Sequence, residues 1–343
     1  MAGPLTPAQR AAVAGAPPAA TGPARLLRGP GRAGRLALRR LGMLVLLLAT
    51  VFAAIELLPG DAANTTSERG ESAADMAARR TALGLDRPLA ERFWDWMTGL
   101  PTGDLGTTAH GQPVTTVLAG PFPNTLLLGT LALVVSITGA LALGCWATLR
   151  PGGRTDRTIA TLCTAAFALP EFVISVALLL VLSLWTGWLP AVTLTGPDGA
   201  PASWDMLVLP LLALAIPQIG WNTRIVRGAL ADQAALPHVQ AAILDGLPRR
   251  RILSHHMLPG ALPAIAVGTA TSAGMLLGGA VVVETLFNYP GIGAVLSGAI
   301  SDRDTPLVAG VVAAGGAAIS ALLLLADLVR EHALGEHTLG ERT

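Results

Sequence analysis

The stretch HVQAAILDGLPRRRILSHHMLPGALP, residues 238–263, interrupts a chain that is otherwise strongly apolar. It carries three consecutive arginines, Arg249–Arg251, and three histidines, and long apolar runs lie on both sides of it. Charged side chains are rare inside a bilayer because burying them there is costly. A polar segment of this length therefore indicates a loop between membrane spans.

Composition places the rest of the chain in a membrane. Of the 343 residues, 52% are hydrophobic and 13% are charged, whereas soluble domains carry roughly 25% charged residues. A membrane-spanning helix needs about 20 apolar residues. We therefore predict an all-α, polytopic membrane protein with six transmembrane helices, at about residues 41–58, 124–149, 159–184, 206–222, 261–287 and 306–328. The fourth span is short and contains Pro210 and Pro217, so we expect it to be kinked or irregular.

Arginine marks every second connection between these spans. It is frequent before the first span, between the second and third, and between the fourth and fifth, whereas residues 185–205 have none. The positive-inside rule then puts both termini and the segment 237–260 in the cytoplasm. The outer loop 59–123 carries several arginines, but long loops are translocated largely regardless of charge. We expect a membrane domain at 34–335, between a disordered cytoplasmic tail at 1–33 and a cytoplasmic tail at 336–343.

The outer loop also contains a stretch that reads as short amphipathic helices, at about residues 72–100. Its aromatic side chains, including Trp94 and Trp96, are expected at the membrane interface, where aromatic rings are favoured.

Several chemical activities are excluded or disfavoured. All 23 basic residues are arginine, so the chain has no lysine for a standard P-loop ATPase or for Schiff-base chemistry. Neither H-E-x-x-H nor G-x-S-x-G occurs. We predict a non-enzyme with no cofactor or metal of its own, and the net charge of +1 gives no case for nucleic acid. Cys145 and Cys163 lie in apolar runs and are expected to be free thiols.

The spacing within residues 240–259 closely resembles the EAA loop of importer-type ABC transporter permeases. That pattern is Glu-Ala-Ala, three residues, Gly, nine residues, Ile, one residue, Leu-Pro. This chain departs from it at two positions, with Gln240 for the Glu and His256 for the Ile. The positions that match are Ala241, Ala242, Gly246, Leu258 and Pro259.

The resemblance implies that residues 237–260 form a coupling loop, through which a cytoplasmic motor pushes on the membrane bundle. A short helix would serve as a rigid handle. Ala241 and Ala242 are small enough to let a partner's groove approach closely, and Gly246 permits a sharp turn at the helix end.

Other stretches look like the dipeptide and oligopeptide branch of these permeases, so that the resemblance covers roughly residues 36–330. They include LPGDAA at 58–63, PNTLLLG at 123–129 and VVVETLFNYPGIGAVL from residue 281. The resemblance implies one half of a heterodimeric pore in a bacterial plasma membrane. Its partners would be a second permease, two ATP-binding subunits that hold ATP and Mg, and an external solute-binding protein that delivers peptides or similar small solutes.

Two further features are candidate sites. Pro290, Gly291 and Gly293 are expected to form a turn at the external mouth of the pore, with Gly291 at positive φ and with Glu284 fixing the approach to the turn. Glu171 follows Pro170 inside the third predicted span. It is a candidate for the transport pathway, because an intramembrane carboxylate is a functional candidate by default.

An alternative reading is an ion-coupled secondary transporter that acts without ATPase subunits. Such a protein is expected to have paired ionisable residues near the middle of the membrane and preferably an internal repeat. Neither is clear in the sequence, which favours the ATP-driven importer and leaves the transported solute open.

Overall fold

The computed structural model describes residues 30–58, 60–65 and 72–340. The chain divides into two units, Met1–Arg39 and Arg40–Thr343. Of the first unit, the described residues are helical from Pro30. The last four residues of the predicted disordered tail, 30–33, are therefore helical, and its remainder lies outside the described residues.

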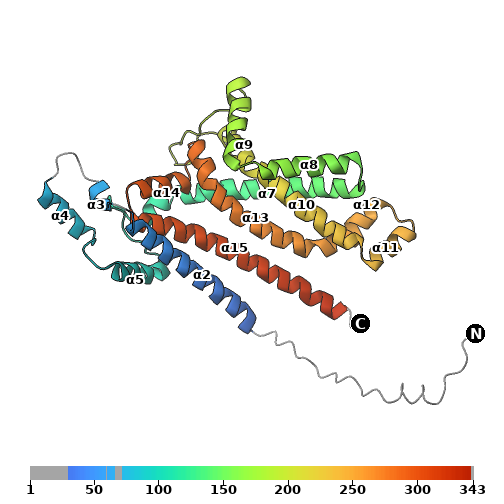
Figure 1. Cartoon of the computed structure of the whole chain (residues 1–343), viewed down its shortest axis with the longest axis horizontal. Coiled ribbons are helices and arrows are strands. Elements are labelled where there is room, and N and C mark those ends of the chain that lie inside the picture. The colour runs from blue at the N-terminus through green and yellow to red at the C-terminus, as the bar shows by residue number, and fades with distance from the viewer. Residues whose placement is uncertain (1–29, 59, 66–71, 341–343) are drawn as a thin grey trace, which may run out of the picture. The chain divides into compact units, whose positions relative to one another are not determined.

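The described residues form helices and no β-strand, apart from two isolated bridges, which confirms the all-α fold class. Figure 1 shows the helices along the chain. The longer helical elements are α2 (Pro30–Glu56), α7 (Pro121–Leu149), α8 (Arg154–Ala168), α10 (Val208–Ala234), α13 (Leu258–Leu286) and α15 (Thr305–Gly340). The shorter elements are α3 (Ala62–Thr65), α4 (Ala73–Ala82), α5 (Leu89–Gly99), η1 (Leu100–Thr102), α6 (Val114–Leu118), α9 (Glu171–Leu178), η2 (Leu179–Trp185), η3 (Trp204–Leu207), α11 (Pro237–Leu244), α12 (Arg249–Arg251), η4 (Ile252–Met257) and α14 (Ile292–Ser301).

Five of the described helical stretches are long and apolar enough to cross a membrane, and a sixth exists if one bent pair counts as a span. That pair is Arg154–Ala168 with Glu171–Trp185, and its two halves are bent by 102°. The third predicted span, at 159–184, is therefore not one straight helix but two helices that meet at a sharp bend. The reason is Pro170, because a proline pushes the residue before it out of the helical region. Leu169 is accordingly extended, with ψ 134°.

The fourth span also differs from its prediction. We expected a short, kinked or irregular segment at 206–222, but α10 is an uninterrupted α-helix of 27 residues that continues to Ala234. Pro210 lies in its first turn, where a helix has backbone N–H groups without intrahelical partners. Pro217 lies inside the helix, and both prolines are buried. Neighbouring helices surround α10, which contacts α7, α8, α9 and α13.

Small residues let these helices pack closely around α10, as expected for membrane bundles. A Cβ added to Gly220 would lie 2.5 Å from the Cys163 carbonyl oxygen of α8. Added to Gly144 of α7 it would lie 2.6 Å from Val226, and added to Gly268 of α13 it would lie 2.8 Å from Ile225. Glycine is therefore needed at these three contacts of α10 with its neighbours.

Polar side chains also join α10 to α13 within the membrane-spanning region. Asn222 Nδ2 donates to Ser272 Oγ at 2.7 Å, and Ser272 Oγ donates to Gln218 Oε1 at 2.6 Å. All three residues are buried. Because all three are buried within the chain, each bond satisfies a polar group that no exposed surface could serve.

The connection between α2 and α7 contains helices α3 to α6, which confirms the short helices predicted near 72–100. The prediction that the aromatic side chains of this connection lie at the membrane interface is wrong for Trp96. That ring is 7% exposed, packs on Phe52, and donates from Nε1 to the Leu105 carbonyl at 2.9 Å. Trp94 is exposed. Trp96 is buried because α5 folds back onto α2, as the Arg92–Glu56 ion pair at 2.7 Å also shows.

Two smaller expectations concern the end of the chain and the cysteines. Helix α15 continues to Gly340, so residues 336–340 of the predicted tail are helical. Residues 341–343 lie outside the described residues. Cys145 and Cys163 are free, as predicted.

We predict that Gly220→Ala destabilises the protein, because the new methyl group meets backbone that cannot move aside. Overpacking of this kind costs about 1–3 kcal/mol. Gly228→Ala is the matched control on the same helix, since a Cβ there meets nothing within 4 Å. Thermal unfolding of the purified variants in detergent checks the prediction. Equal midpoints for the two variants would contradict the close packing of α8 on α10.

Candidate functional site

The segment 237–260 begins with a short helix that ends in a sharp turn. Helix α11 ends at Leu244 with Asp245 as its C-cap, and Gly246 follows with φ +73°. The Gly246 N–H donates to the Ile243 carbonyl at 3.1 Å, and the Leu247 N–H donates to the Ala242 carbonyl at 3.2 Å. These two bonds form a Schellman motif, whose left-handed position favours glycine. The predicted turn at Gly246 is therefore present.

One face of α11 is buried in the bundle and the other is exposed. Val239 and Ala242, 0% and 4% exposed, pack in a cluster with side chains of α7, α10, η4 and α13. Ala241 is exposed, and so are the large apolar residues Ile243, at 50%, and Leu244, at 86%. The expectation that both alanines face a partner is wrong for Ala242, because it is buried in the contact that holds α11 to the bundle.

Gln240 has a role that the sequence pattern does not show. Its Nε2 donates to the Ala234 carbonyl at 2.6 Å, at the end of α10. The last carbonyls of a helix have no intrahelical donor, so this bond caps α10. A glutamate carboxylate, which carries no N–H, could not make it. The glutamine at this position therefore makes a local hydrogen bond that an ionised glutamate could not make.

The return to the membrane runs through η4, whose Ile252, Leu253 and Met257 are buried. Leu258 and Pro259, the last two positions of the matched pattern, open α13, and Pro259 lies in its first turn. His238 Nε2 lies 3.3 Å from the His256 carbonyl oxygen, so the start of α11 is close to the end of η4. The seven matched or substituted pattern residues thus lie together in the segment that follows the end of α10 and leads into the start of α13.

A cavity of about 870 Å³ lies beside α11. Arg249 donates from Nη1 to the Leu149 carbonyl at 3.1 Å and so caps α7. Arg227 of α10 pairs with Asp156 of α8. The first contact holds the segment against α7, and the second joins α10 to α8. The residues that line the cavity include Thr148, Arg224, Arg227, Val239, Ile243 and Arg249.

At the other end of α13, Glu284 organises the turn that contains Pro290, Gly291 and Gly293. Its carboxylate is fully buried and accepts hydrogen bonds from Thr125 Oγ1 and from the Gly293 N–H, both at 2.6 Å. Thr125 Oγ1 also accepts from the Ile292 N–H at 2.9 Å. Glu284 thus ties α7, α13 and α14 together, which agrees with the expected structural role.

The reason for glycine at position 291 differs from the expected one. Gly291 has φ −112°, which any residue can adopt, and the positive φ of this turn belongs to Asn288, at 51°. A Cβ on Gly291 would instead lie 2.3 Å from Glu284 Cδ, and one on Gly293 would lie 2.7 Å from Val281 Cα. Both glycines are required by close packing around the carboxylate.

Tyr289 completes this turn. It is fully buried and donates from its hydroxyl to the Asn124 carbonyl at 2.9 Å. Burial, with the neighbouring Glu284 charge, raises the pKa of Tyr289, so the hydroxyl stays a donor at neutral pH. Asn124 Nδ2 in turn donates to the Pro290 carbonyl at 2.8 Å.

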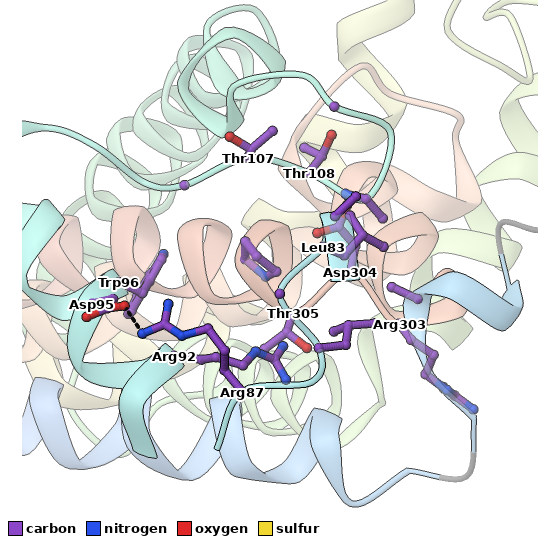
Figure 2. A pocket seen from close by; sticks show the side chains of 18 of the residues that line it. Leu83, Arg87, Arg92, Asp95, Trp96, Thr107, Thr108, Arg303, Asp304 and Thr305 are labelled. Carbon is purple, nitrogen blue, oxygen red and sulfur yellow. Dashed lines mark hydrogen bonds and ion pairs between the residues drawn. The ribbon is translucent and has the colours of Figure 1, made fainter. Parts of the chain in front are cut away.

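The connection 59–123 lines a second cavity, of about 640 Å³, near the start of α15. Figure 2 shows Arg87, Arg92 and Trp96 on one side of it, with Thr305 beside them and Asp304 farther away, near Leu83. Burial raises the pKa of Asp304, while hydrogen bonds from the Ala109 and Leu307 N–H groups oppose this shift. The cavity thus has a polar wall whose charges are largely engaged within the chain.

Glu171 is the first residue of α9, directly after the break at Leu169–Pro170. Its carboxylate faces Gly279 of α13, where an added Cβ would lie 2.1 Å from Oε2. The structure therefore brings Glu171 against α13, the helix on which Glu284 also lies.

Sequence reasoning missed the polar contacts between helices. The Gln218–Asn222–Ser272 cluster and the Arg227–Asp156 pair join residues about 50 to 70 positions apart. Polar residues inside an apolar run were a signal that could have pointed to the first of these. Partners so distant in the chain could not be assigned without the fold.

Two family models match the chain. The family described as "Binding-protein-dependent transport system inner membrane component" matches residues 140–333, and its N-terminal companion, "Binding-prot-dependent transport system membrane comp, N-term", matches residues 35–128. The chain belongs to this family. It is an ABC transporter permease subunit and a multi-pass membrane protein, which confirms the resemblance stated from the 240–259 pattern.

Two similar proteins of known name agree with this assignment. The "probable peptide ABC transporter permease protein y4tP" of Sinorhizobium fredii is 32% identical over 85% of this chain and 94% of that protein. The "glutathione transport system permease protein GsiC" of Pectobacterium atrosepticum is 31% identical over 77% of this chain and 85% of that protein. A solved structure described as an amino acid ABC transporter with histidines covers 64% of this chain and 94% of that chain, at 16% identity and a TM-score of 0.48.

We predict that Thr125→Val loosens the turn around Glu284 in the permease. The change removes a donor to the buried carboxylate and an acceptor for Ile292, and each unsatisfied buried group costs about 1–3 kcal/mol. Hydrogen–deuterium exchange of residues 288–294 should accelerate at least about tenfold, whereas Thr125→Ser, which keeps the hydroxyl, should stay near the wild type. Equal protection in all three proteins would show that Glu284 does not hold the turn.

Proposed function

We propose that this permease subunit pairs with a second, similar permease to form the pathway of an importer for peptides or similar small solutes. Two ATP-binding subunits would dock on the 237–260 segment and hold ATP and Mg, and a solute-binding protein would deliver the solute on the opposite side. Family membership and the names of the relatives support the class of solute and the kinds of partner.

The observation that carries the docking proposal is the exposed apolar end of α11. Leu244 is 86% exposed although it lies on a helix whose other face is locked into the bundle. An exposed apolar side chain on a rigid handle is suited to a pocket in a partner, since burying a leucine contributes about 1.5–3 kcal/mol. The cluster around Val239 and Ala242 would pass the partner's motion to α10 and α13.

The ion-coupled alternative has less support. In the described part of the chain, Glu56 pairs with Arg92, Asp327 pairs with Arg40, and Glu284 is held by Thr125. These three carboxylates have structural partners within the chain. An ATP-driven mechanism needs no coupling ion and uses the exposed α11, which a lone transporter would leave without a role.

We propose an orientation with both termini and α11 in the cytoplasm and with the 59–123 connection outside. The arginine distribution supports this orientation. The turn at 290–293 and the cavity of Figure 2 would then face the side from which the binding protein delivers solute. Lipid would contact the exposed apolar faces of the spans.

Docking is tested by Leu244→Asp, with Leu244→Met as the volume-conserving control. Neither substitution should disturb the backbone, because the Leu244 side chain projects into solvent. We expect Leu244→Asp to reduce co-purification of the ATP-binding subunits and solute uptake by about 10–100-fold, the loss of one buried leucine contact. Leu244→Met should retain both. Normal assembly and uptake with Leu244→Asp would show that α11 is not the docking element.

Orientation is tested by single cysteines in a background with Cys145→Ala and Cys163→Ala. Ser72 and Ser254 are both exposed and lie in the 59–123 connection and in η4. In intact cells, an impermeant thiol reagent should modify Ser72→Cys and leave Ser254→Cys unmodified until the cells are opened. The reverse labelling pattern would show that the orientation is opposite to the proposed one, with α11 outside the cell.

A further inference from the structure

A single carboxylate lies at the break in the third span. The two halves, Arg154–Ala168 and Glu171–Trp185, are 15 residues each, so the break falls halfway along the pair. Figure 1 shows α9 turning away from α8 at this point. Transporters commonly place their solute sites at discontinuous helices, because the helix ends there offer polar groups within the membrane.

Glu171 differs from the other acidic residues in or beside the spans. Glu56, Glu284 and Asp327 each have an ion pair or hydrogen bonds to the chain. Among the described residues, none supplies the Glu171 carboxylate with a hydrogen bond or an ion pair; its neighbour Ser175 bonds to its backbone carbonyl instead. The side chain is half-buried, so one part of it stays accessible from outside the chain.

The local packing keeps this carboxylate in place. Gly279 of α13 leaves room for it, since a Cβ there would lie 2.1 Å from Oε2 and 2.6 Å from Oε1. Glu171 is also the first residue of a helix, where the positive end of the helix dipole stabilises an anion. The residues that follow it on α9 include the apolar Phe172 and Val176, which are exposed, and Ile174, which is buried. A half-buried anion is screened less by water and salt than one in solution, so it attracts a cation more strongly.

We propose that Glu171 binds a cationic amino group of the transported solute as it passes the break in the third span. The fitting class of solute is one with a free primary ammonium group, such as a peptide with an unblocked amino terminus. The inference rests on the proposed function in peptide import. It adds a specificity-determining contact inside the membrane, separate from the selection made by the delivering protein.

The test uses the reconstituted complex of both permeases, the ATP-binding subunits and the loaded binding protein, with labelled Ala-Ala as the solute. Glu171→Gln should lower uptake about tenfold or more, the effect of losing a hydrogen bond to a charged group. Glu171→Asp, which keeps the charge, should restore part of it. Asp327→Asn is the control, since that carboxylate already pairs with Arg40, and its uptake should stay near the wild type.

Chemical rescue separates solute binding from a merely structural role. In the background without Cys145 and Cys163, Glu171→Cys should be inactive and should regain uptake when a sulfonate-bearing methanethiosulfonate restores a negative charge. A trimethylammonium-bearing reagent of similar size should not restore it, and Ala-Ala should slow both modifications. Rescue by both reagents, or by neither, would overturn the proposal.

The outcomes distinguish this inference from the function on which it rests. If the wild-type complex takes up Ala-Ala and Glu171→Gln does so equally well, Glu171 is not a solute contact and the importer proposal stands. If Glu171→Gln loses the second permease on purification, the carboxylate pairs with that subunit, and the proposal fails. If the wild-type complex takes up no peptide, both proposals fail together.

Discussion

The burial of one face of α11 is the constraint on which the rest of the account depends. Val239 and Ala242 lie in the same cluster as side chains of α7, α10, η4 and α13, so α11 cannot move without moving the helices that cross the membrane. The Schellman turn at Gly246 and the Gln240 cap on α10 fix the two ends of this handle. The exposed face, with Ile243 and Leu244, is thereby left for a partner.

Helix α13 links this handle to the opposite end of the bundle. It begins at Leu258, next to η4, and ends at Leu286, where Glu284 holds the 290–293 turn against α7. The polar cluster of Gln218, Asn222 and Ser272 joins it to α10 along the way. A push on α11 would therefore reach the far turn through two helices tied together by close glycine contacts and buried hydrogen bonds.

Sequence alone could predict the apolar spans, the short helix between two of them and the turn at Gly246, because each depends on local composition or spacing. It could not predict which way Ala242 faces, since the buried side of an eight-residue helix is set by the helices it meets. The break at Pro170 was visible as a proline, but its 102° angle depends on packing. Gly291 was assigned a backbone role, yet its contact is with Glu284, a residue placed there only by the fold.

The most direct test of the central claim is site-specific photo-crosslinking from α11 in the assembled transporter. A benzophenone amino acid at Leu244, which projects from the exposed face, should crosslink to an ATP-binding subunit, and the yield should change when ATP is added. The same probe at Trp94, exposed in the 59–123 connection, should give no such product. Crosslinking of the ATP-binding subunit from Trp94 and not from Leu244 would contradict the account.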